Sequence, residues 1–253
     1  MIIAQISDSH LALDTPDAAR RLADFERTIA DINALDPAPD LIIHTGDIVQ
    51  NGRLDEYAEA ARILADARAP VHLMVGNKDD RANLRETFSQ HAYLQECGEF
   101  IAYAIEDLPV RIIVVDTLNP GSNKGEFCED RRAGLTAMFA QDTARPVAVF
   151  AHHPPFLVQE GPDALHFESQ ETMLRFRQAL RACATLTAVF CGHVHRGVAG
   201  TVGPVPVLVM PCIATSLRRG EYPKALTTSP IYHLHRFEPD GVFTSELRIV
   251  GRS

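Results

Sequence analysis

The chain lacks the features that define several classes of protein. No stretch of its 253 residues approaches the roughly 18 continuous apolar residues that a membrane-spanning helix requires, so membrane insertion is not expected. Its five cysteines are odd in number, scattered and without a C-x-x-C pair, which favours reduced thiols over a disulfide framework. The N-terminus has no basic segment followed by a long apolar run and a cleavage site, and the cytoplasm is therefore the expected compartment.

Basic residues are also scarce. Lys and Arg number 24 against 33 Asp and Glu, which gives a formal net charge of −9. Proteins that grip a nucleic-acid backbone draw their affinity from clustered Lys and Arg, so a nucleic-acid polymer is not an expected partner. A small anionic substrate stays compatible with this charge if metal ions reverse it locally.

The first two-thirds of the chain alternate strand and helix patterns, as in a mainly parallel sheet. Strands are expected at residues 2–7, 40–45, 71–75 and 146–151, and helices at about 17–35, 53–68, 80–90, 129–142 and 168–183. Residues 100–105 and 110–117 are expected to form an antiparallel pair. The long loops are expected at 117–128 and 156–167, above the strand ends, where substrate selection usually resides.

The remainder of the chain is rich in β patterns from about residue 200. Strand patterns at 205–210, 230–237 and 241–250 are separated by turn residues, and these strands are expected to be antiparallel. The length can bury one large core, and neither a repeat nor a linker divides it. We therefore expect an α/β protein with a single domain over residues 1–253, in which two sheets stack face to face with helices outside.

Short polar segments follow the strand patterns and carry most of the functional information. They are Asp8-Ser9-His10, Gly46-Asp47, Gly76-Asn77, His152-His153-Pro154-Pro155 and Gly192-His193-Val194-His195. Asp, Asn and His thus recur where an α/β sheet presents its strand ends to a crevice. Together they offer a complete ligand set for two metal ions.

The residue types and spacings suit such a pair of ions. Asp8 and His10 stand at i and i+2, so on an extended strand end both side chains face one ion. Asp47 is the candidate to bridge both ions, at a separation of about 3.5–4 Å. Asn77, His152 and one histidine of the last segment would serve the second ion, and the other histidine would complete the first. Imidazole ligands favour Mn, Fe, Zn or Co over Ca or Mg.

The motifs D-x-H, G-D, G-N, H-H-P-P and G-H-x-H, in this order over residues 1 to about 200, resemble those of the calcineurin-like metallophosphoesterases. The likeness is greatest to the bacterial class III cyclic-nucleotide and glycerophosphodiester phosphodiesterases. It implies a four-layer α/β/β/α sandwich with two mixed sheets flanked by helices. It also implies a dinuclear phosphodiesterase that hydrolyses a small phosphodiester, a 3′,5′-cyclic nucleotide or a glycerophosphodiester, by attack of a metal-bridging hydroxide. A homodimer or higher homo-oligomer would be consistent with the family.

The resemblance also implies a role for each matching residue. The first ion is assigned to Asp8, His10, Asp47 and His195, and the second to Asp47, Asn77, His152 and His193. His153 is left beside the ligands or in the pocket wall. The residues expected to take part in catalysis are Asp47, Asn77, Lys78 and His153.

Lys78 departs from the family pattern. The family usually has Gly-Asn-His followed by Asp or Glu, with the histidine contacting the phosphate, whereas this chain has Gly76-Asn77-Lys78-Asp79. Lysine still holds a phosphate oxygen by its charge but is a poor general acid. A phosphomonoesterase or phosphonate-ester hydrolase therefore remains an alternative. A scaffold without turnover is a further one, although such a protein is expected to have lost ligands and none is missing here.

Other polar residues near these motifs have ordinary structural explanations. His44, His233 and His235 are expected to be structural, and Cys191 is expected to pack as a small buried hydrophobe. Asp79 and Asp80 are candidates either to orient a ligand or to cap the next helix. Three arginines, Arg81, Arg218 and Arg219, are expected at the solvated surface rather than on a phosphate. Gly46, Gly76 and Gly192 are expected to permit tight turns.

Overall fold

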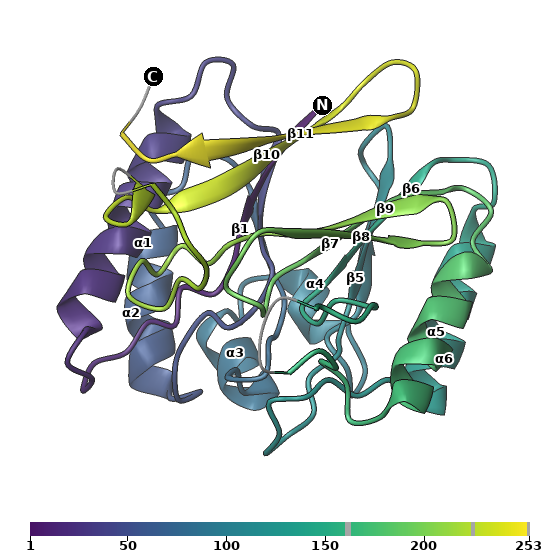
Figure 1. Ribbon diagram of the computed structural model, residues 1–253, viewed down its shortest axis with the longest axis horizontal. Coiled ribbons are helices and arrows are strands. Elements are labelled where there is room, and N and C mark those ends of the chain that lie inside the picture. Colours follow the sequence, from purple (N-terminus) through teal and green to yellow (C-terminus); the bar gives the residue numbers. More distant parts are fainter. Residues whose placement is uncertain (160–162, 224–225, 252–253) are drawn as a thin grey trace.

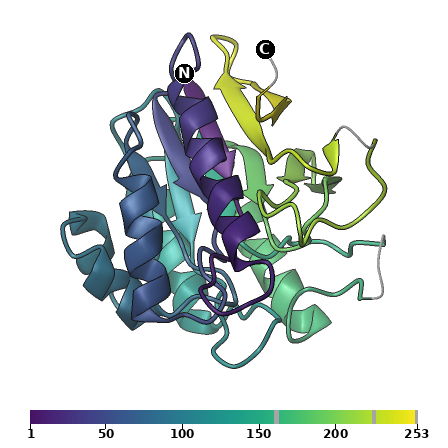
Figure 2. The ribbon, with the colours of Figure 1, turned by 90° about the vertical axis from the view of Figure 1, so that its left-hand side faces the viewer.

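Two stacked β-sheets lie between two layers of helices in the computed structural model, which describes residues 1–159, 163–223 and 226–251 (Figure 1). The helices are α1 (Ala18–Asn33), α2 (Leu54–Leu64), α3 (Arg81–Thr87), α4 (Ala92–Gln95), α5 (Glu129–Gln141) and α6 (Gln170–Arg181). Helices α1 and α2 form one flank, and α5 and α6 form the other. Figure 2 shows α1 and α2 side by side over their sheet.

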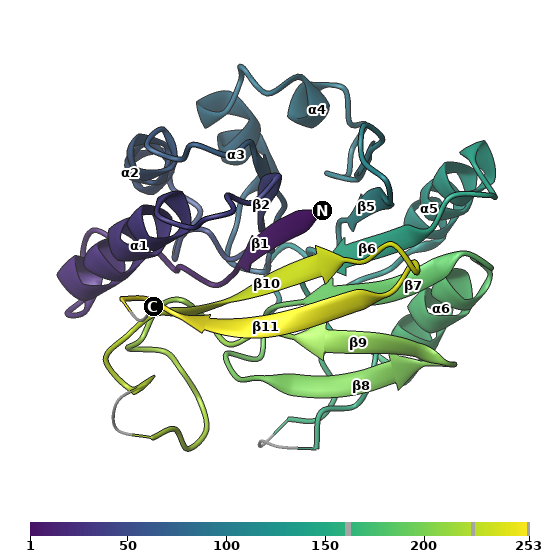
Figure 3. The same cartoon turned by 90° about the horizontal axis from the view of Figure 1, so that it is seen from above.

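The first sheet has five strands in the order β11-β10-β1-β2-β3. These are β1 (Ile2–Ile6), β2 (Leu41–His44), β3 (Val71–Leu73), β10 (Ile231–Phe237) and β11 (Phe243–Ile249). Strands β1, β2 and β3 are parallel, whereas β10 is antiparallel to both β1 and β11. The C-terminal hairpin therefore extends the sheet that the N-terminus begins (Figure 3).

The second sheet has six strands in the order β4-β5-β6-β7-β9-β8. They are β4 (Tyr103–Ile105), β5 (Arg111–Val115), β6 (Val147–Ala151), β7 (Leu186–Cys191), β8 (Val198–Val202) and β9 (Val205–Val209). Strands β5, β6, β7 and β9 are parallel, and β4 and β8 are antiparallel edges. Both sheets are thus mixed, and the four-layer α/β/β/α sandwich is confirmed. The single domain over residues 1–253 stays a prediction.

Strands β5 and β6 are buried along their whole length, and all their residues except Arg111 are apolar, because both faces of their sheet are covered. Every second residue of these two strands, Phe150 among them, belongs to a core that fills the space between the two sheets and continues to α1 and α2. Their neighbours, Val149 among them, pack against α5 and α6. The continuous apolar runs in the sequence therefore reflect two cores rather than one.

Two features of the C-terminal third differ from expectation. Strand β8 was not predicted, because its sequence VAGTV is short, contains a glycine and lies at a partly exposed edge. Strand β8 forms an antiparallel hairpin with β9. The chain thereby reverses direction, and β9 pairs with β7 in parallel. The expectation that residues 205–210 form only antiparallel pairs was therefore wrong. Within the described ranges no helix is both long enough and apolar enough to cross a membrane.

The core between the sheets should dominate stability. The Phe150 ring is fully buried and lies 4.9 Å from the Phe190 ring, measured between centroids. We expect Phe150→Ala to lower the free energy of unfolding by about 3–5 kcal/mol, measured by urea denaturation of the metal-free protein. The control Leu174→Ala, at a position that is 43% exposed, should change it by less than about 0.5 kcal/mol. Equal losses in both variants would contradict this assignment of the core.

Candidate functional site

Four predicted ligands converge at the carboxyl ends of the parallel strands. Donor atoms of Asp8, His10, Asp47 and His195 all lie within 4.8 Å of one another. His10 Nε2 lies 2.9 Å from His195 Nε2 and 3.3 Å from an Asp47 carboxylate oxygen, and His195 Nε2 lies 3.3 Å from an Asp8 oxygen. When the bonds from an ion to its ligand atoms are about 2.1 Å long, neighbouring ligand atoms lie about 3 Å apart. The spacing of these donor atoms therefore fits a metal site.

The other predicted ligands gather on the far side of Asp47. The amide oxygen of Asn77 lies 2.8 Å from His193 Nδ1 and 3.2 Å from His152 Nε2. His152 Nε2 in turn lies 3.5 Å from the same Asp47 oxygen that faces His10. The structure therefore places Asp47 between the two groups of donors.

Left-handed backbone turns aim several of these side chains. The non-glycine residues with positive φ in the described ranges are Asp8 (55°), His10 (43°), Asp47 (51°), His193 (73°) and His195 (61°). Every one of them is a predicted ligand. Such conformations are strained for non-glycine residues and tend to cluster at functional sites. The argument that Asp8 and His10 converge through the alternation of an extended strand was wrong, because β1 ends at Ile6 and both residues have a left-handed backbone conformation.

Glycines let the segments approach closely. A Cβ atom on Gly76 would collide with the Asp47 carboxylate and lie 2.7 Å from the His152 ring, and one on Gly192 would meet the Ser7 hydroxyl. Gly46 has a φ of 91° and would collide with the backbone of Gly76. Of the three, Gly46 has the positive φ of a tight turn that the sequence analysis expected, whereas Gly76 and Gly192 are required by the close approach of neighbouring atoms.

Carbonyl groups set the histidine tautomers. His152 Nδ1 lies 2.8 Å from the carbonyl oxygen of Thr45, and His195 Nδ1 lies 3.2 Å from that of Leu217. A carbonyl only accepts hydrogen bonds, so Nδ1 keeps its proton in the neutral ring, and Nε2 is the nitrogen that faces the carboxylates and can give up a proton to bind an ion. Arg21 donates to the carbonyl of His10 at 3.1 Å and so supports another predicted ligand.

Asp79 holds two of the ligand turns together. Its buried carboxylate accepts hydrogen bonds from the backbone N–H of Gly76 at 2.8 Å and of Ile48 at 3.2 Å, and from the Tyr57 hydroxyl at 2.9 Å. Burial and the nearby Asp47 charge raise the pKa of Asp79 to about 7. Its neighbour Asp80 caps α3 by accepting from Asn83 N. The two roles left open in the sequence therefore divide between these residues.

Opposite charges dominate the electrostatics of the site. Burial opposes ionisation of Asp47, but His152 and His10 outweigh it and lower the Asp47 pKa to about 2. Burial of Asp8 is likewise outweighed by His10 and His195, and its pKa lies well below the usual value. Burial would lower the pKa of His152, yet the two carboxylates raise it to about 9. Buried carboxylates facing imidazole nitrogens of fixed orientation form a donor set that fits two divalent metal ions.

Lys78 and His153, also predicted at the site, lie beside these donors. The backbone N–H of Lys78 donates to an Asp47 oxygen at 2.7 Å, and its ammonium group donates to Asn123 Oδ1 at 2.8 Å. His153 Nδ1 lies 2.8 Å from the Thr117 hydroxyl. Its Nε2 is buried without a hydrogen-bond partner among the described residues.

Sequence reasoning missed Asn123 and His166. Asn123 lies in the loop at 117–128 and contacts both Asn77 and Lys78, and the His166 ring lies 4.9 Å from the His193 ring. Neither residue belongs to one of the polar motifs that follow a strand. The only feature of the sequence that could have indicated a role for them is their position in the two long loops expected above the strand ends. Residues 160–162 of the second long loop lie outside the described residues.

The structural roles expected for other polar residues near the motifs are confirmed for some of them and wrong for others. His44 is buried with Nε2 2.8 Å from the Ser9 hydroxyl, His235 bonds to Gln5, and Cys191 is buried, all as expected. The expectation of a solvated surface was wrong for two of the three arginines. Arg81 forms a paired contact with the buried carboxylate of Asp116, and Arg218 donates to the carbonyl groups of residues 212, 226 and 229. Arg219 is exposed.

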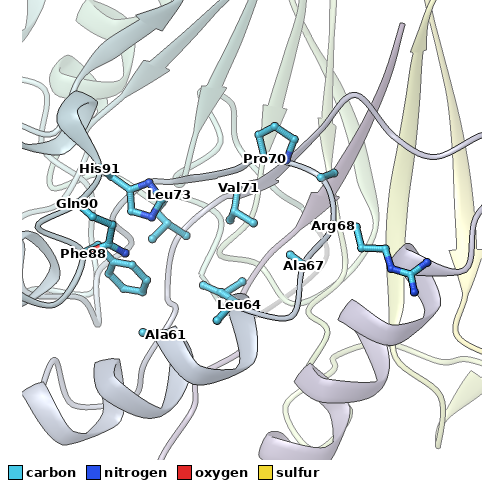
Figure 4. A pocket seen from close by; sticks show the side chains of 12 residues that line it. Ala61, Leu64, Ala67, Arg68, Pro70, Val71, Leu73, Phe88, Gln90 and His91 are labelled. Carbon is cyan, nitrogen blue, oxygen red and sulfur yellow. The ribbon is translucent and has the colours of Figure 1, made fainter.

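A hollow of about 440 Å³ opens away from these donors, at the edge of the first sheet (Figure 4). It is lined by residues from the end of α2, the start of β3 and the segment after α3, including Leu64, Val71 and Phe88. No predicted site residue lines it. The chemistry of the strand ends, rather than the hollow, therefore identifies the candidate site.

Metal binding should displace a proton. With a pKa of about 9, His152 is protonated in the metal-free chain near neutral pH, and an ion bound to Nε2 must replace that proton. We expect the release of about one proton on binding at the second position, and less as the pH rises through the pKa. Calorimetric titration with Mn²⁺ in Hepes and Tris at one pH measures it. A binding heat that does not depend on the buffer would contradict the expectation.

Known proteins are similar to this chain in sequence. A probable glycerophosphodiester phosphodiesterase of Arcobacter nitrofigilis is 29% identical over 265 residues, which cover 100% of this chain and 94% of the relative. A 3′,5′-cyclic adenosine monophosphate phosphodiesterase of Pseudomonas aeruginosa is 25% identical over 248 residues, covering 95% and 87%.

The fold is shared more widely. A dimetal phosphatase from Danio rerio superposes with a TM-score of 0.69 at 15% identity, covering 99% of this chain and 98% of that one. The sequence model of the calcineurin-like phosphoesterase family matches residues 1–197, which contain all the predicted ligands. The resemblance seen in the motifs is thereby confirmed, and the chain belongs to the calcineurin-like phosphoesterase family.

Proposed function

We propose that the protein is a dinuclear metal-dependent phosphodiesterase that hydrolyses a small phosphodiester. The observation that carries this proposal is the place of Asp47. One of its carboxylate oxygens lies 3.3 Å from His10 Nε2 and 3.5 Å from His152 Nε2, between the two groups of donors. A shared carboxylate in this position suits two adjacent ions.

We divide the candidate ligands between the ions as the family resemblance implies. Asp8, His10, Asp47 and His195 would hold the first ion, and Asp47, Asn77, His152 and His193 the second. The mixture of carboxylate, amide and imidazole donors supports Mn, Fe, Zn or Co. Two such ions would lower the pKa of water and neutralise the phosphoryl oxygens of a bound ester.

The chain's own residues would bind and orient the ester. Lys78 places a positive charge next to Asn77, where it would hold a phosphate oxygen. His153 presents its unpaired Nε2 beside His193, with 4.3 Å between the ring centroids. Carbonyl groups hold the His152 and His195 rings in place, so little reorganisation is needed when substrate arrives.

The similar enzymes support a small diester as substrate. One is named as a glycerophosphodiester phosphodiesterase and another as a cyclic AMP phosphodiesterase, and we extend both substrate classes to this chain as candidates. All five cysteines are free, which supports the reducing cytoplasm as the compartment. A homodimer stays a prediction.

Metal content and turnover test the proposal. The purified protein should hold close to two transition-metal ions per chain and hydrolyse bis-p-nitrophenyl phosphate when loaded with Mn²⁺. Asp47→Asn should lower kcat/KM at least about 100-fold because both ions lose a ligand, with the circular dichroism spectrum retained. Asp240→Asn, in the exposed turn before β11, is the matched control and should keep full activity. A loaded wild type without turnover of any phosphate ester would favour a scaffold instead.

The acid strength of the residue at position 78 should affect how fast a poor leaving group departs. If lysine is a poor acid at this position, Lys78→His should raise the rate on an alkyl diester relative to bis-p-nitrophenyl phosphate by roughly 100-fold. The ratio of the two kcat/KM values measures this and cancels effects common to both substrates. An unchanged ratio would show that the missing acid does not limit the reaction. Phosphomonoesters and phosphonate esters in the same assay test the alternative activity.

A further inference from the structure

Asn123 joins two residues of the candidate site that belong to another segment. Its side-chain oxygen accepts a hydrogen bond from the Lys78 ammonium group at 2.8 Å and another from the Asn77 amide nitrogen at 3.3 Å. Lys78 and Asn77 follow β3, whereas Asn123 lies between β5 and α5. One oxygen atom thus holds the end of a predicted ligand and the lysine beside it.

Lys78 fixes the direction of the hydrogen bonds among these three side chains. An ammonium group only donates hydrogen bonds, so Asn123 must turn its oxygen rather than its NH₂ group toward Lys78. The same oxygen then attracts the NH₂ group of Asn77. The Asn77 oxygen is left facing His193 and His152, at 2.8 and 3.2 Å. A flipped Asn77 amide would place its NH₂ group among the metal donors and could not ligate an ion.

The loop that carries Asn123 is well anchored. Gly125 pairs with Phe167, and a Cβ atom at Gly125 would lie 2.8 Å from the His153 ring. Asn119 donates to Glu168 at 2.8 Å. The backbone of Asn123 is therefore held in place where its side chain contacts Asn77, although that side chain is exposed.

We propose that Asn123 is a positioning residue that, together with Lys78, fixes the amide of Asn77 with its oxygen toward the second metal ion. The inference rests on the proposed function and gives the unusual lysine a role besides contact with phosphate. Partners that orient metal ligands typically contribute 10- to 100-fold to metal affinity, so the effect is measurable without turnover.

Titration of the metal-free protein with Mn²⁺ alone, followed by electron paramagnetic resonance of the free ion, tests the proposal. Asn123→Ala should weaken binding of the second Mn²⁺ by roughly 10-fold or more and leave the first unchanged. Asn123→Asp keeps an acceptor oxygen for both donors and should restore the affinity to within about 3-fold of the wild type. Asn119→Ala removes one anchor of the loop but no hydrogen bond of the cluster, and it should stay within about 3-fold of the wild type because the pairing of Gly125 with Phe167 still holds the loop.

Lys78→Met separates orientation from charge. Removal of a positive charge near two cations should tighten Mn²⁺ binding if repulsion were its only effect. Loss of orientation predicts weaker binding of the second ion, the opposite sign. Tighter or unchanged binding would overturn the role given to Lys78.

Other outcomes overturn the rest of the proposal. Wild-type affinity in Asn123→Ala, an equal loss in Asn119→Ala, or failure of Asn123→Asp to restore binding would each show that Asn123 does not orient Asn77. A wild type that binds two Mn²⁺ but hydrolyses no phosphate ester would overturn the proposed function and leave the positioning result standing.

Discussion

The buried carboxylate of Asp47 is the group on which the candidate site depends. It contacts imidazoles from both sides, and its charge, with that of Asp8, raises the pKa of His152 to about 9. Two ionised carboxylates in a buried place require compensating positive charge. Imidazolium supplies part of it in the metal-free chain, and the same geometry suits divalent ions. The electrostatics of the donor set and its capacity for cations therefore have one cause.

The sandwich brings this carboxylate and its partners together. Asp8, Asp47 and Asn77 follow strands of the first sheet, whereas His152, His193 and His195 follow strands of the second. Neither sheet alone holds a full set of donors. The buried side chain of Gln5 links the sheets directly, since it donates from β1 to the carbonyl of Cys191 at the end of β7, 3.1 Å away. Packing between the sheets and ligand geometry are thus coupled.

Local strain accompanies this arrangement. Five predicted ligands adopt positive φ angles, and close contacts at Gly46, Gly76 and Gly192 leave no space for a side chain. Such conformations cost about 1–3 kcal/mol each and persist only where the surroundings determine them. Here Asp79 ties the Asp47 turn to the Gly76 turn through backbone N–H groups. The fold therefore holds the turns in conformations that isolated peptides would rarely adopt.

The sequence by itself determined the strand–helix order, the apolar runs and the donors that follow the strands, because each is a local pattern read over a few residues. That was enough for the family, the sandwich and the two groups of candidate donors. Tertiary structure decided what depends on distant segments. It placed Asn123 against Lys78 and Asn77, made β9 parallel to β7 and paired Arg81 with the buried carboxylate of Asp116. It also replaced the expected extended geometry of Asp8 and His10 by left-handed turns, because the two sheets, once stacked, require the ligands to turn inward at their shared edge.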